Sequence, residues 1–491
     1  MIIKSDIATR RLYATDASVY QELPVSVAFP ENSDDCIALV KVASKNKTPL
    51  IFRAAGTSIA GQCVGGGQVV DVSRFLTGIL GEPSENQIRV QPGVIHSDLD
   101  LFLKPFNLKF SPEISTSNRC MIGGMIGNNA AGSHSVIYGT TREHVVAIEA
   151  LLSNGTVVEF GPLTDEQLQA KCTLPTREGE IYRTVTGLIK QHRLEILKRY
   201  PKPEIIRRNT GYPLDVLANS QPFNSQGPPF NLAPFLCGTE GTLAFTLSAT
   251  LSLVEPPEAK GLVCIHFTTL DEAMLATPVI LKHQPAAIEL MDKRLLALTE
   301  NHIVHRRNRQ WIEGSPEAVL AVEFFGRSDL EIHKKIKTLT ASLKTQKLGY
   351  AYPVISTADT TNVWAIRKAG LGLLMGVNQP KKPVAVIEDS AVAPSDLFSY
   401  TKAISAIMAR EKINCVYYGH ASVGLLHLRP ELDLAQSEDL LLFTALADEI
   451  ADLVKRFNGS LSGEHGDGRL RGPFLEKMVG AELYDAHEDI K

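Results

Sequence analysis

The sequence predicts an α+β fold made of more than one domain. Short apolar strands alternate with amphipathic helices, Gly-rich loops interrupt the first half of the chain, and the pattern changes after the Pro-Pro pair at residues 256–257. A chain of 491 residues is too long for one ordinary hydrophobic core. We therefore expect a first domain over residues 1–256, divided near residue 75, a second domain over 257–450 and a terminal segment over 451–491.

The first 75 residues predict one helix and two strands. Residues 33–43 begin with Ser33 as a helix N-cap and an acidic first turn, and apolar residues then follow at helical spacing. Residues 49–53 and 68–72 form short apolar strands, and the first of them runs directly into a Gly-rich loop. This pattern of elements is typical of a small α/β subdomain.

Residues 76–256 predict further strands. Residues 150–159 place Asn154-Gly155 between two apolar runs, which indicates a hairpin with a type I′ turn. Residues 244–254 alternate as a strand and end at the Pro-Pro pair, which we interpret as a domain boundary.

The second domain is predicted to be compact and α+β. Residues 263–267 and 319–325 read as strands, each followed by a helix over 270–282 and 330–343, and a long helix over 437–457 leads out of the domain. Residues 384–389 read as a strand ending in Glu388 and Asp389. These two acids fit an active-site role and a solvated strand end equally well.

Composition excludes several classes of protein. The net charge of -4 argues against a nucleic-acid binder, which normally has a basic face. The seven cysteines include no CxxC pair, so neither a disulfide framework nor a thiolate iron–sulfur site is indicated. No apolar run approaches the roughly 20 residues of a membrane span, and the N-terminus lacks a signal-peptide core. We expect a cytoplasmic location, with docking on a membrane surface left open.

Three Gly-rich loops predict a cofactor site. They cover residues 53–62, residues 111–133 and residues 237–243. Small residues let successive backbone N–H groups approach a phosphate or a flat ligand. The first loop is neither a Walker A sequence nor GxGxxG. Three such loops, far apart in the sequence, suit one long ligand, and a flavin dinucleotide meets that demand.

Two segments near the C-terminus predict a metal site. Gly419 to His427 and Ser462 to Gly468 supply three imidazoles, His420, His427 and His465, and the carboxylate of Glu464. A catalytic metal needs about three protein ligands and one open position, so one of the four groups is left to act as a base. The alternative is two ordinary polar turns with surface histidines.

These motifs together resemble a known family, the FAD-linked oxidoreductases with a vanillyl-alcohol-oxidase-type (PCMH-type) flavin domain. Within it, the chain is similar to D-lactate, glycolate and D-2-hydroxyglutarate dehydrogenases. The motifs Gly463 to Arg469 (GEHGDGR) and His427 to Pro430 (HLRP) resemble the flavin half of large dehydrogenases that also carry an iron–sulfur half. The resemblance implies a two-subdomain PCMH-type FAD-binding domain, an α+β (ferredoxin-like) substrate cap and a C-terminal segment that returns to the flavin.

The resemblance also implies roles for individual residues. His420, His427 and Glu464 would bind a divalent metal, with zinc favoured over manganese or cobalt, and His465 would be the general base. Arg367, which matches a substrate arginine of the family, and Arg429, which shares a strand face with His427, would bind the substrate carboxylate. The alternatives are helix-face solvation for Arg367 and a surface salt bridge for Arg429. The resemblance implies a non-covalent FAD held by Arg53, Ala55, Gly56, Thr57, Ser58, Gly61, Gln62, Pro112, Glu113, Ser117, Ile122, Gly123, Gly124, Asn129, Gly132, Glu240, Gly241 and Thr242.

The activity implied is oxidation of a D-2-hydroxy acid, D-2-hydroxyglutarate or D-lactate, to its 2-oxo acid by hydride transfer to flavin N5. Two inward arginines would favour a substrate with two carboxylates. The electron acceptor is left open among a quinone, a cytochrome, an electron-transfer flavoprotein and an iron–sulfur partner or half. The alternatives are a non-redox alkyl-transfer flavoenzyme of the same fold, and a flavin-binding subunit of a larger dehydrogenase. His96, His134, His144 and His283 show no partner pattern and are interpreted as structural.

Overall fold

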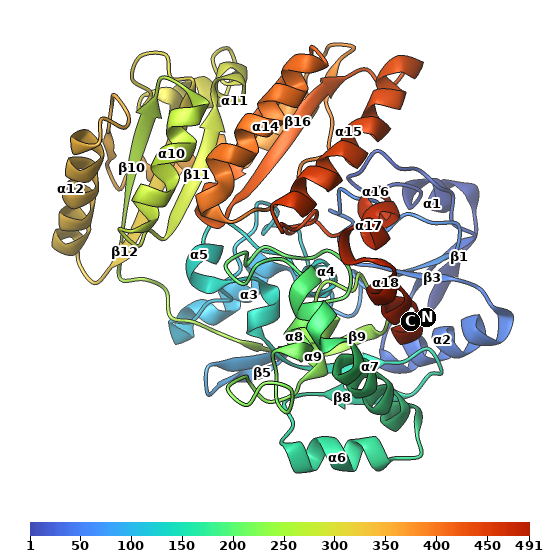
Figure 1. Ribbon diagram of the computed structural model, residues 1–491. Helices are drawn as coiled ribbons and strands as arrows, with labels where there is room; N and C mark the ends of the chain where they lie inside the picture. Colours follow the sequence, from blue (N-terminus) through green and yellow to red (C-terminus); the bar gives the residue numbers. More distant parts are fainter.

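A computed structural model describes residues 1–491 and contains three β-sheets with helices packed around them (Figure 1). Sheets of four and five strands form the flavin-domain region, and a sheet of seven strands forms the cap above it. The α+β class predicted from the sequence is confirmed. The domain boundaries at residues 256 and 450 stay predictions.

The first sheet has the strand order β1-β2-β4-β3. β2, β4 and β3 are parallel, and β1 adds an antiparallel edge. A turn of apolar residues on α2 packs over it, and the rings of Phe52 and Phe245 stack at 4.0 Å to join this sheet to the next. The elements are β1 (Ile2–Lys4), α1 (Ile7–Leu12), β2 (Ser26–Phe29), α2 (Ser33–Asn46), β3 (Leu50–Arg53) and β4 (Gln68–Asp71).

The second sheet is antiparallel, with the order β5-β6-β9-β7-β8. Its strands are β5 (Ile79–Ser84), β6 (Gln87–Val90), β7 (Val145–Leu151), β8 (Val157–Phe160) and β9 (Phe245–Ser252). The helices around it are α3 (His96–Leu103), α4 (Ile122–Asn128), α5 (Ser135–Tyr138), α6 (Asp165–Thr173), α7 (Arg177–Arg199), α8 (Leu214–Ala218) and α9 (Leu232–Leu236). The Gly-rich residues 122–133 therefore contain α4 and lead into α5.

The cap sheet is antiparallel throughout, with the order β13-β10-β12-β11-β15-β16-β14. Its strands are β10 (Ala259–Phe267), β11 (Ala287–Asp292), β12 (Ala318–Gly326), β13 (Val354–Ile355), β14 (Lys382–Pro383), β15 (Cys415–His420) and β16 (Leu425–Leu432). Its helices are α10 (Leu270–Leu281), α11 (Lys293–Leu298), α12 (Asp329–Thr345), α13 (Thr360–Met375), α14 (Leu397–Arg410) and α15 (Ser437–Arg456).

The two faces of the cap sheet differ in chemistry. One face is apolar and packs against α10, α12 and α14 within the largest hydrophobic cluster. Successive side chains of a strand point to opposite faces. The register therefore places a second set of residues on the other face, which α11 and α13 cover. That set includes the polar side chains Glu289, Glu323, His420, His427 and Arg429.

The chain after α15 returns from the cap to the flavin-domain region (Figure 1). α18 packs on α7, and the hydroxyl of Tyr200 lies 3.0 Å from Nε2 of His487. The returning helices are α16 (Gly468–Arg471), α17 (Leu475–Val479) and α18 (Ala481–Ile490). Short 3₁₀ helices are η1 (Lys104–Phe106), η2 (Thr141–His144), η3 (His305–Arg309), η4 (Pro394–Asp396), η5 (Ala421–Val423) and η6 (Gly472–Phe474).

Three local predictions are wrong. The N-cap of α2 is Asn32, whose side chain accepts a hydrogen bond from the N–H of Asp35, and Ser33 is already helical. The β7–β8 connection is not a type I′ turn: Gly155 alone has a positive φ, and its N–H donates to the carbonyl of Leu152. Residues 384–389 form turns and bends, because their two acids turn inward instead of ending a strand.

One glycine tests the close packing of the cap. Gly261 lies in β10 beneath α12, and a Cβ there would come within 2.1 Å of Cγ2 of Ile332. We expect Gly261→Ala to lower the free energy of unfolding by about 1–3 kcal/mol, because this overpacks the core. Gly187 in α7 is the matched control: its added Cβ meets nothing within 4 Å, so Gly187→Ala should stabilise by about 0.5–1 kcal/mol. Urea unfolding measures both, and effects of equal sign would contradict the packing argument.

Candidate active site

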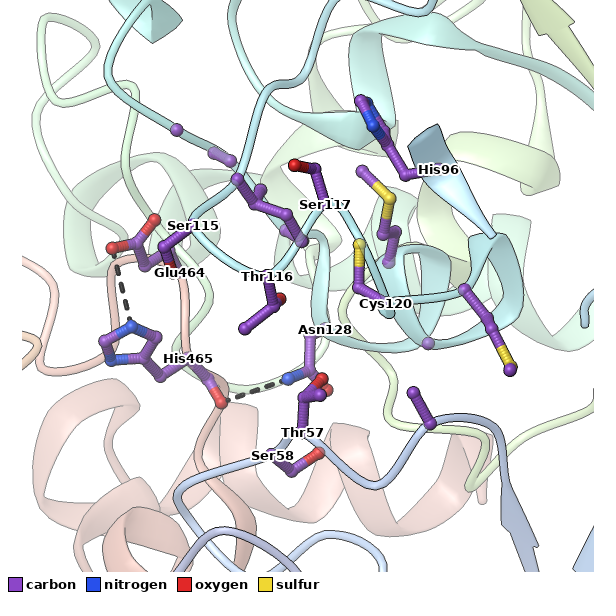
Figure 2. A pocket seen from close by; sticks show the side chains of 18 of the residues that line it. Thr57, Ser58, His96, Ser115, Thr116, Ser117, Cys120, Asn128, Glu464 and His465 are labelled. Carbon is purple, nitrogen blue, oxygen red and sulfur yellow. Dashed lines mark hydrogen bonds and ion pairs between the residues drawn. The ribbon is translucent and has the colours of Figure 1, made fainter. Parts of the chain in front are cut away.

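One cavity of about 750 Å³ connects the Gly-rich loops to the histidine–glutamate segments. This volume is in the range of small-molecule and cofactor sites. Figure 2 shows the loops converging on it: Thr57 and Ser58 from the first loop, Ser115 to Ser117 and Asn128 from the second, and Glu464 and His465 from the C-terminal segment. The loops that were predicted to share one ligand are therefore brought together.

Most of the residues predicted to bind the cofactor line this cavity. They are Arg53, Ala55, Gly56, Thr57, Ser58, Gln62, Glu113, Ser117, Gly123, Gly124, Gly132, Glu240 and Gly241. Gly61, Pro112, Ile122, Asn129 and Thr242 do not line it. The side chain of Asn129 is buried and accepts hydrogen bonds from Thr140 and from the N–H of Arg142, so it supports the loop from behind.

Gly132 shows why the second loop requires a glycine. A Cβ at this position would lie 1.3 Å from the carbonyl oxygen of Glu113. The two backbone segments can therefore come this close only because residue 132 has no side chain. Nearby, Oε1 of Gln62 is buried without a hydrogen-bond partner and faces the same cavity. Both observations fit a site built for a bound cofactor with polar groups.

The predicted metal ligands form a buried cluster. Nε2 of His420 lies 3.1 Å from Oε1 of Glu464, and Nε2 of His427 lies 3.5 Å from the same oxygen. The candidate ligand atoms of these three residues all lie within 4.8 Å of one another. Two imidazoles and a carboxylate are a ligand set that zinc and related metals accept.

The other ring nitrogens of the two histidines are held by acceptors. Nδ1 of His420 lies 2.7 Å from Oε1 of Glu289, and Nδ1 of His427 lies 2.9 Å from the carbonyl of Glu388. Such partners fix the tautomer and direct Nε2 toward a metal. Carboxylates and carbonyls that orient histidines in this way are typical of metal sites, so the donor set fits a divalent cation.

Glu464 is held from the side opposite the histidines. Nη1 of Arg207 donates to its Oε2, and Arg207 also donates to the hydroxyl of Ser135 at 2.9 Å and to the carbonyl of Gly132 at 2.7 Å. Burial opposes ionisation of Glu464, but the positive charge of Arg207 outweighs it. The pKa of Glu464 therefore lies well below its ordinary value.

Asp389 shapes the loop that carries Glu464 and His465. Its carboxylate accepts hydrogen bonds from the N–H of Gly463 at 2.9 Å, of Glu464 at 3.1 Å and of His465 at 2.9 Å. Its neighbour Glu388 accepts from Arg471 at 2.7 Å and from Arg429 at 3.2 Å. Both acids are fully buried, so the solvated alternative is wrong.

His465 lies at the boundary between the cluster and the flavin loops. Its Nδ1 lies 2.8 Å from Oε1 of Glu388, and its carbonyl accepts from Gln62 at 2.5 Å and from Asn128 at 3.4 Å (Figure 2). Burial lowers the pKa of His465, but Glu388 and Asp389 outweigh burial and raise it to about 9.

Both predicted substrate arginines are buried and line the cavity. Nε of Arg367 donates to Oε2 of Glu289 at 2.6 Å, while its Nη2 has no hydrogen-bond partner. Nε of Arg429 donates to the hydroxyl of Tyr418 at 3.1 Å. The alternatives of helix-face solvation for Arg367 and a surface salt bridge for Arg429 are both wrong.

Sequence reasoning missed Glu289 and Arg207, which hold the ligands in place. Glu289 could have been found, because it is a charged residue inside the otherwise apolar run Ala287 to Met291. Arg207 gives no such signal, since it lies in a polar stretch beside Arg208.

His134 was interpreted as structural, and the structure gives it two carboxylate partners that no sequence pattern indicated. Its Nε2 lies 2.5 Å from Oε2 of Glu323 in β12, and its Nδ1 lies 3.3 Å from Oε2 of Glu113. Burial lowers the pKa of His134, but the two carboxylates outweigh burial and raise it to about 9. The ring is therefore a cation in the wall of the cavity at neutral pH.

Two families match separate parts of the chain. Residues 24–161 match the family described as FAD binding domain, and residues 256–491 match FAD linked oxidases, C-terminal domain. The chain belongs to the FAD-linked oxidases. The family predicted from the sequence is confirmed, and FAD is the cofactor that the matched binding domain supports.

Relatives of this FAD-linked oxidase chain include longer proteins. It is 34% identical to a D-2-hydroxyglutarate dehydrogenase of Pseudomonas putida, over 100% of this chain and 49% of the relative. It is 25% identical to the glycolate oxidase subunit GlcD of Bacillus subtilis, over 99% of this chain and 89% of the relative. The chain spans about half the length of the D-2-hydroxyglutarate dehydrogenases that it matches.

Solved structures agree on the fold. A p-cresol methylhydroxylase with substrate bound superposes with a TM-score of 0.68 at 11% identity, covering 100% of this chain and 90% of that one. An alkyldihydroxyacetonephosphate synthase superposes with a TM-score of 0.62 at 15% identity, covering 99% of this chain and 82% of that one.

None of the helices in this FAD-linked oxidase is both long and apolar enough to span a bilayer.

Removing Arg207 should destabilise the protein strongly. Arg207→Met leaves Glu464 buried without its cation, and breaking a buried ion pair costs about 3–5 kcal/mol. Arg469→Met is the control, since Arg469 pairs with Glu22 at the surface and should change stability by less than about 1 kcal/mol. Urea unfolding measures both, and a small effect of Arg207→Met would show that Glu464 does not need this partner.

The stabilising charge of His134 should depend on pH. Its folded pKa, about 9, lies above its ordinary value of 6.5. The stabilisation is therefore complete below pH 6.5 and is lost as pH rises through 9, a change of about 3 kcal/mol. We expect the stability difference between wild type and His134→Gln, measured by urea unfolding, to shrink between pH 6.5 and 10. A difference that is constant over this range would contradict the assigned protonation.

Proposed function

We propose that this chain is the catalytic flavin portion of a metal-assisted, FAD-dependent dehydrogenase of a D-2-hydroxy acid. The observation that carries the proposal is the single cavity in which the FAD loops, the His420–His427–Glu464 cluster and two buried arginines meet. The relatives named as D-2-hydroxyglutarate and D-lactate dehydrogenases support this reaction class.

Oxidation of a 2-hydroxy acid removes the hydroxyl proton and the α-hydride together. FAD, when bound, supplies the hydride acceptor at N5. The metal, when bound by His420, His427 and Glu464, supplies a Lewis acid for the substrate hydroxyl and a positive charge that lowers the pKa of His465. His465 then accepts the hydroxyl proton on Nε2, while Glu388 holds its Nδ1.

The two arginines bind the acid. Arg367 offers an unpartnered Nη2 to a carboxylate, and its Nε stays on Glu289, which fixes the guanidinium. Arg429 extends from the same face of the cap sheet as His427. Two buried cations on one cavity wall favour a substrate with two carboxylates, so D-2-hydroxyglutarate is the first candidate and D-lactate the second.

The electron acceptor completes the proposal. The matched D-2-hydroxyglutarate dehydrogenases are about twice as long as this chain, so we propose that reduced flavin passes its electrons to an iron–sulfur half or partner subunit. A quinone, a cytochrome or an electron-transfer flavoprotein is the alternative acceptor. A cytoplasmic location, with contact at a membrane surface for a quinone acceptor, follows from the same proposal.

Anaerobic bleaching of the flavin tests the reaction. D-2-hydroxyglutarate, D-lactate, D-malate and glycolate are each added to flavin-loaded protein, with and without a chelator. We expect one D-acid to bleach the flavin, chelation to abolish bleaching and zinc to restore it. His465→Gln should retain FAD but slow bleaching by about 10²–10⁴-fold, because it removes the general base.

Failure of every acid to bleach zinc-replete, flavin-loaded protein would overturn the dehydrogenase proposal for this chain. It would favour the non-redox alkyl-transfer reaction or a flavin-binding subunit that needs the remainder of a larger dehydrogenase. Bleaching that persists in the presence of the chelator would overturn only the proposed role of the metal.

A further inference from the structure

Helix α13 is attached to the cap sheet by two parallel sets of polar contacts. Arg367 donates to Glu289 at 2.6 Å, and Trp364 donates through Nε1 to Oε1 of Glu323 at 3.3 Å. Residues three apart lie on one side of a helix. Glu289 pairs with Ala321 and Glu323 pairs with Ala287 in the sheet register, so both carboxylates project from the same face, beneath α13.

Each of the two carboxylates also holds a histidine, and the two histidines come from different parts of the fold. Glu289 accepts from His420, a predicted metal ligand at the end of β15. Glu323 pairs with His134, which caps α5 in the flavin-domain region. The first set therefore joins α13 to the metal cluster within the cap, and the second set joins α13 to the flavin-domain region across the cavity.

The surroundings of His134 make the second set a firm attachment. Glu323 is 3% exposed and His134 is 7% exposed, so the pair is desolvated and breaking it leaves a buried charge. The His134 ring also contacts Phe325 at 5.0 Å and Trp364 at 6.2 Å between centroids. On the flavin side, Glu113 lies 3.3 Å from Nδ1 of His134 and is itself paired with Lys109.

The segment that carries His134 is also linked, through Arg207, to the predicted metal cluster. Arg207 donates to the carbonyl of Gly132 and to the hydroxyl of Ser135, and the same guanidinium holds Glu464. α5 lies at the junction of the cap and the flavin-domain region (Figure 1). Residues 132–135 therefore fix three things relative to one another: the flavin loops, Glu464 and, through His134, helix α13.

We propose that His134 is a positioning residue that attaches α13 to the flavin-domain region and thereby places Arg367, at a fixed distance from the flavin, for the substrate carboxylate. The inference rests on the proposed function for the role of Arg367. It assigns to His134, Glu323 and Trp364 a task in substrate binding that acts through the placement of Arg367.

The test compares His134→Gln with His192→Gln in anaerobic flavin reduction by the acid that bleaches wild type. His192 is the matched control, because it is a buried histidine paired with Glu482 at 2.7 Å, outside the cavity. We expect His134→Gln to raise the half-saturating acid concentration at least tenfold, with a smaller fall in the limiting rate. The Kd for FAD should stay within threefold, because Glu113 keeps Lys109, and His192→Gln should change neither quantity more than twofold.

Two further variants separate positioning from general damage. His134→Gln/Glu323→Gln replaces the charged pair by two amides and should recover part of the lost acid affinity, since no buried charge is left alone. Trp364→Phe keeps an aromatic ring but removes the N–H to Glu323 together with part of the indole, and it should raise the half-saturating concentration about threefold or more. If His134→Gln does not fold, Trp364→Phe becomes the deciding variant. An unchanged half-saturating acid concentration in Trp364→Phe would then overturn the proposal.

Hydrogen exchange gives a readout that does not depend on turnover. Peptides from α13 should exchange faster in His134→Gln than in wild type, while peptides from α12 should not change. Unchanged exchange in α13, or a half-saturating concentration within twofold of wild type, would overturn the positioning role. If wild type is not reduced by any acid but α13 still loosens in His134→Gln, the attachment stands and the proposed function alone fails.

Discussion

The site depends on four carboxylates that the fold buries in one place. Glu289, Glu388 and Asp389 are fully buried, and Glu464 is 7% exposed. A buried carboxylate is tolerated only when cations and N–H groups surround it. Its partners here come from distant parts of the chain, namely Arg207, Arg367, Arg429, Arg471, His420 and His465. Satisfying these charges brings the flavin-domain region, the cap and the C-terminal segment to a single point.

Side chains alternate between the two faces of the cap strands, and this places the charged groups of the site on a rigid sheet. One face of the sheet is packed with apolar side chains against three helices, so the strands have little freedom to shift. The other face then holds His420, His427 and Arg429 at positions set by the β15–β16 register. Sites built on strands are held more closely than sites on loops, which suits the proposed metal cluster and the proposed substrate arginine, since these would have to act together.

The sequence is informative where function needs an unusual local composition. The Gly-rich loops and the two histidine segments could be predicted, because few core-forming stretches contain so many small residues or metal-binding donors. Arg207 could not be predicted and the role of Asp389 could only be left open, because both act through contacts across more than 70 residues of chain. The strand predicted for residues 384–389 fails for the same reason. Its acids satisfy buried groups, and the backbone turns to deliver them.

The two carboxylates beneath α13, Glu289 and Glu323, link this helix to different parts of the fold. Glu289 links Arg367 to His420, a proposed metal ligand, and all three residues belong to the cap sheet and the helix that covers it. Glu323 links Trp364 to His134, so this contact crosses from the cap to the flavin-domain region. Helix α13 therefore has one polar attachment within the cap and one to the flavin-domain region. Under the proposed role of Arg367, the second attachment sets the distance between the bound acid and the flavin.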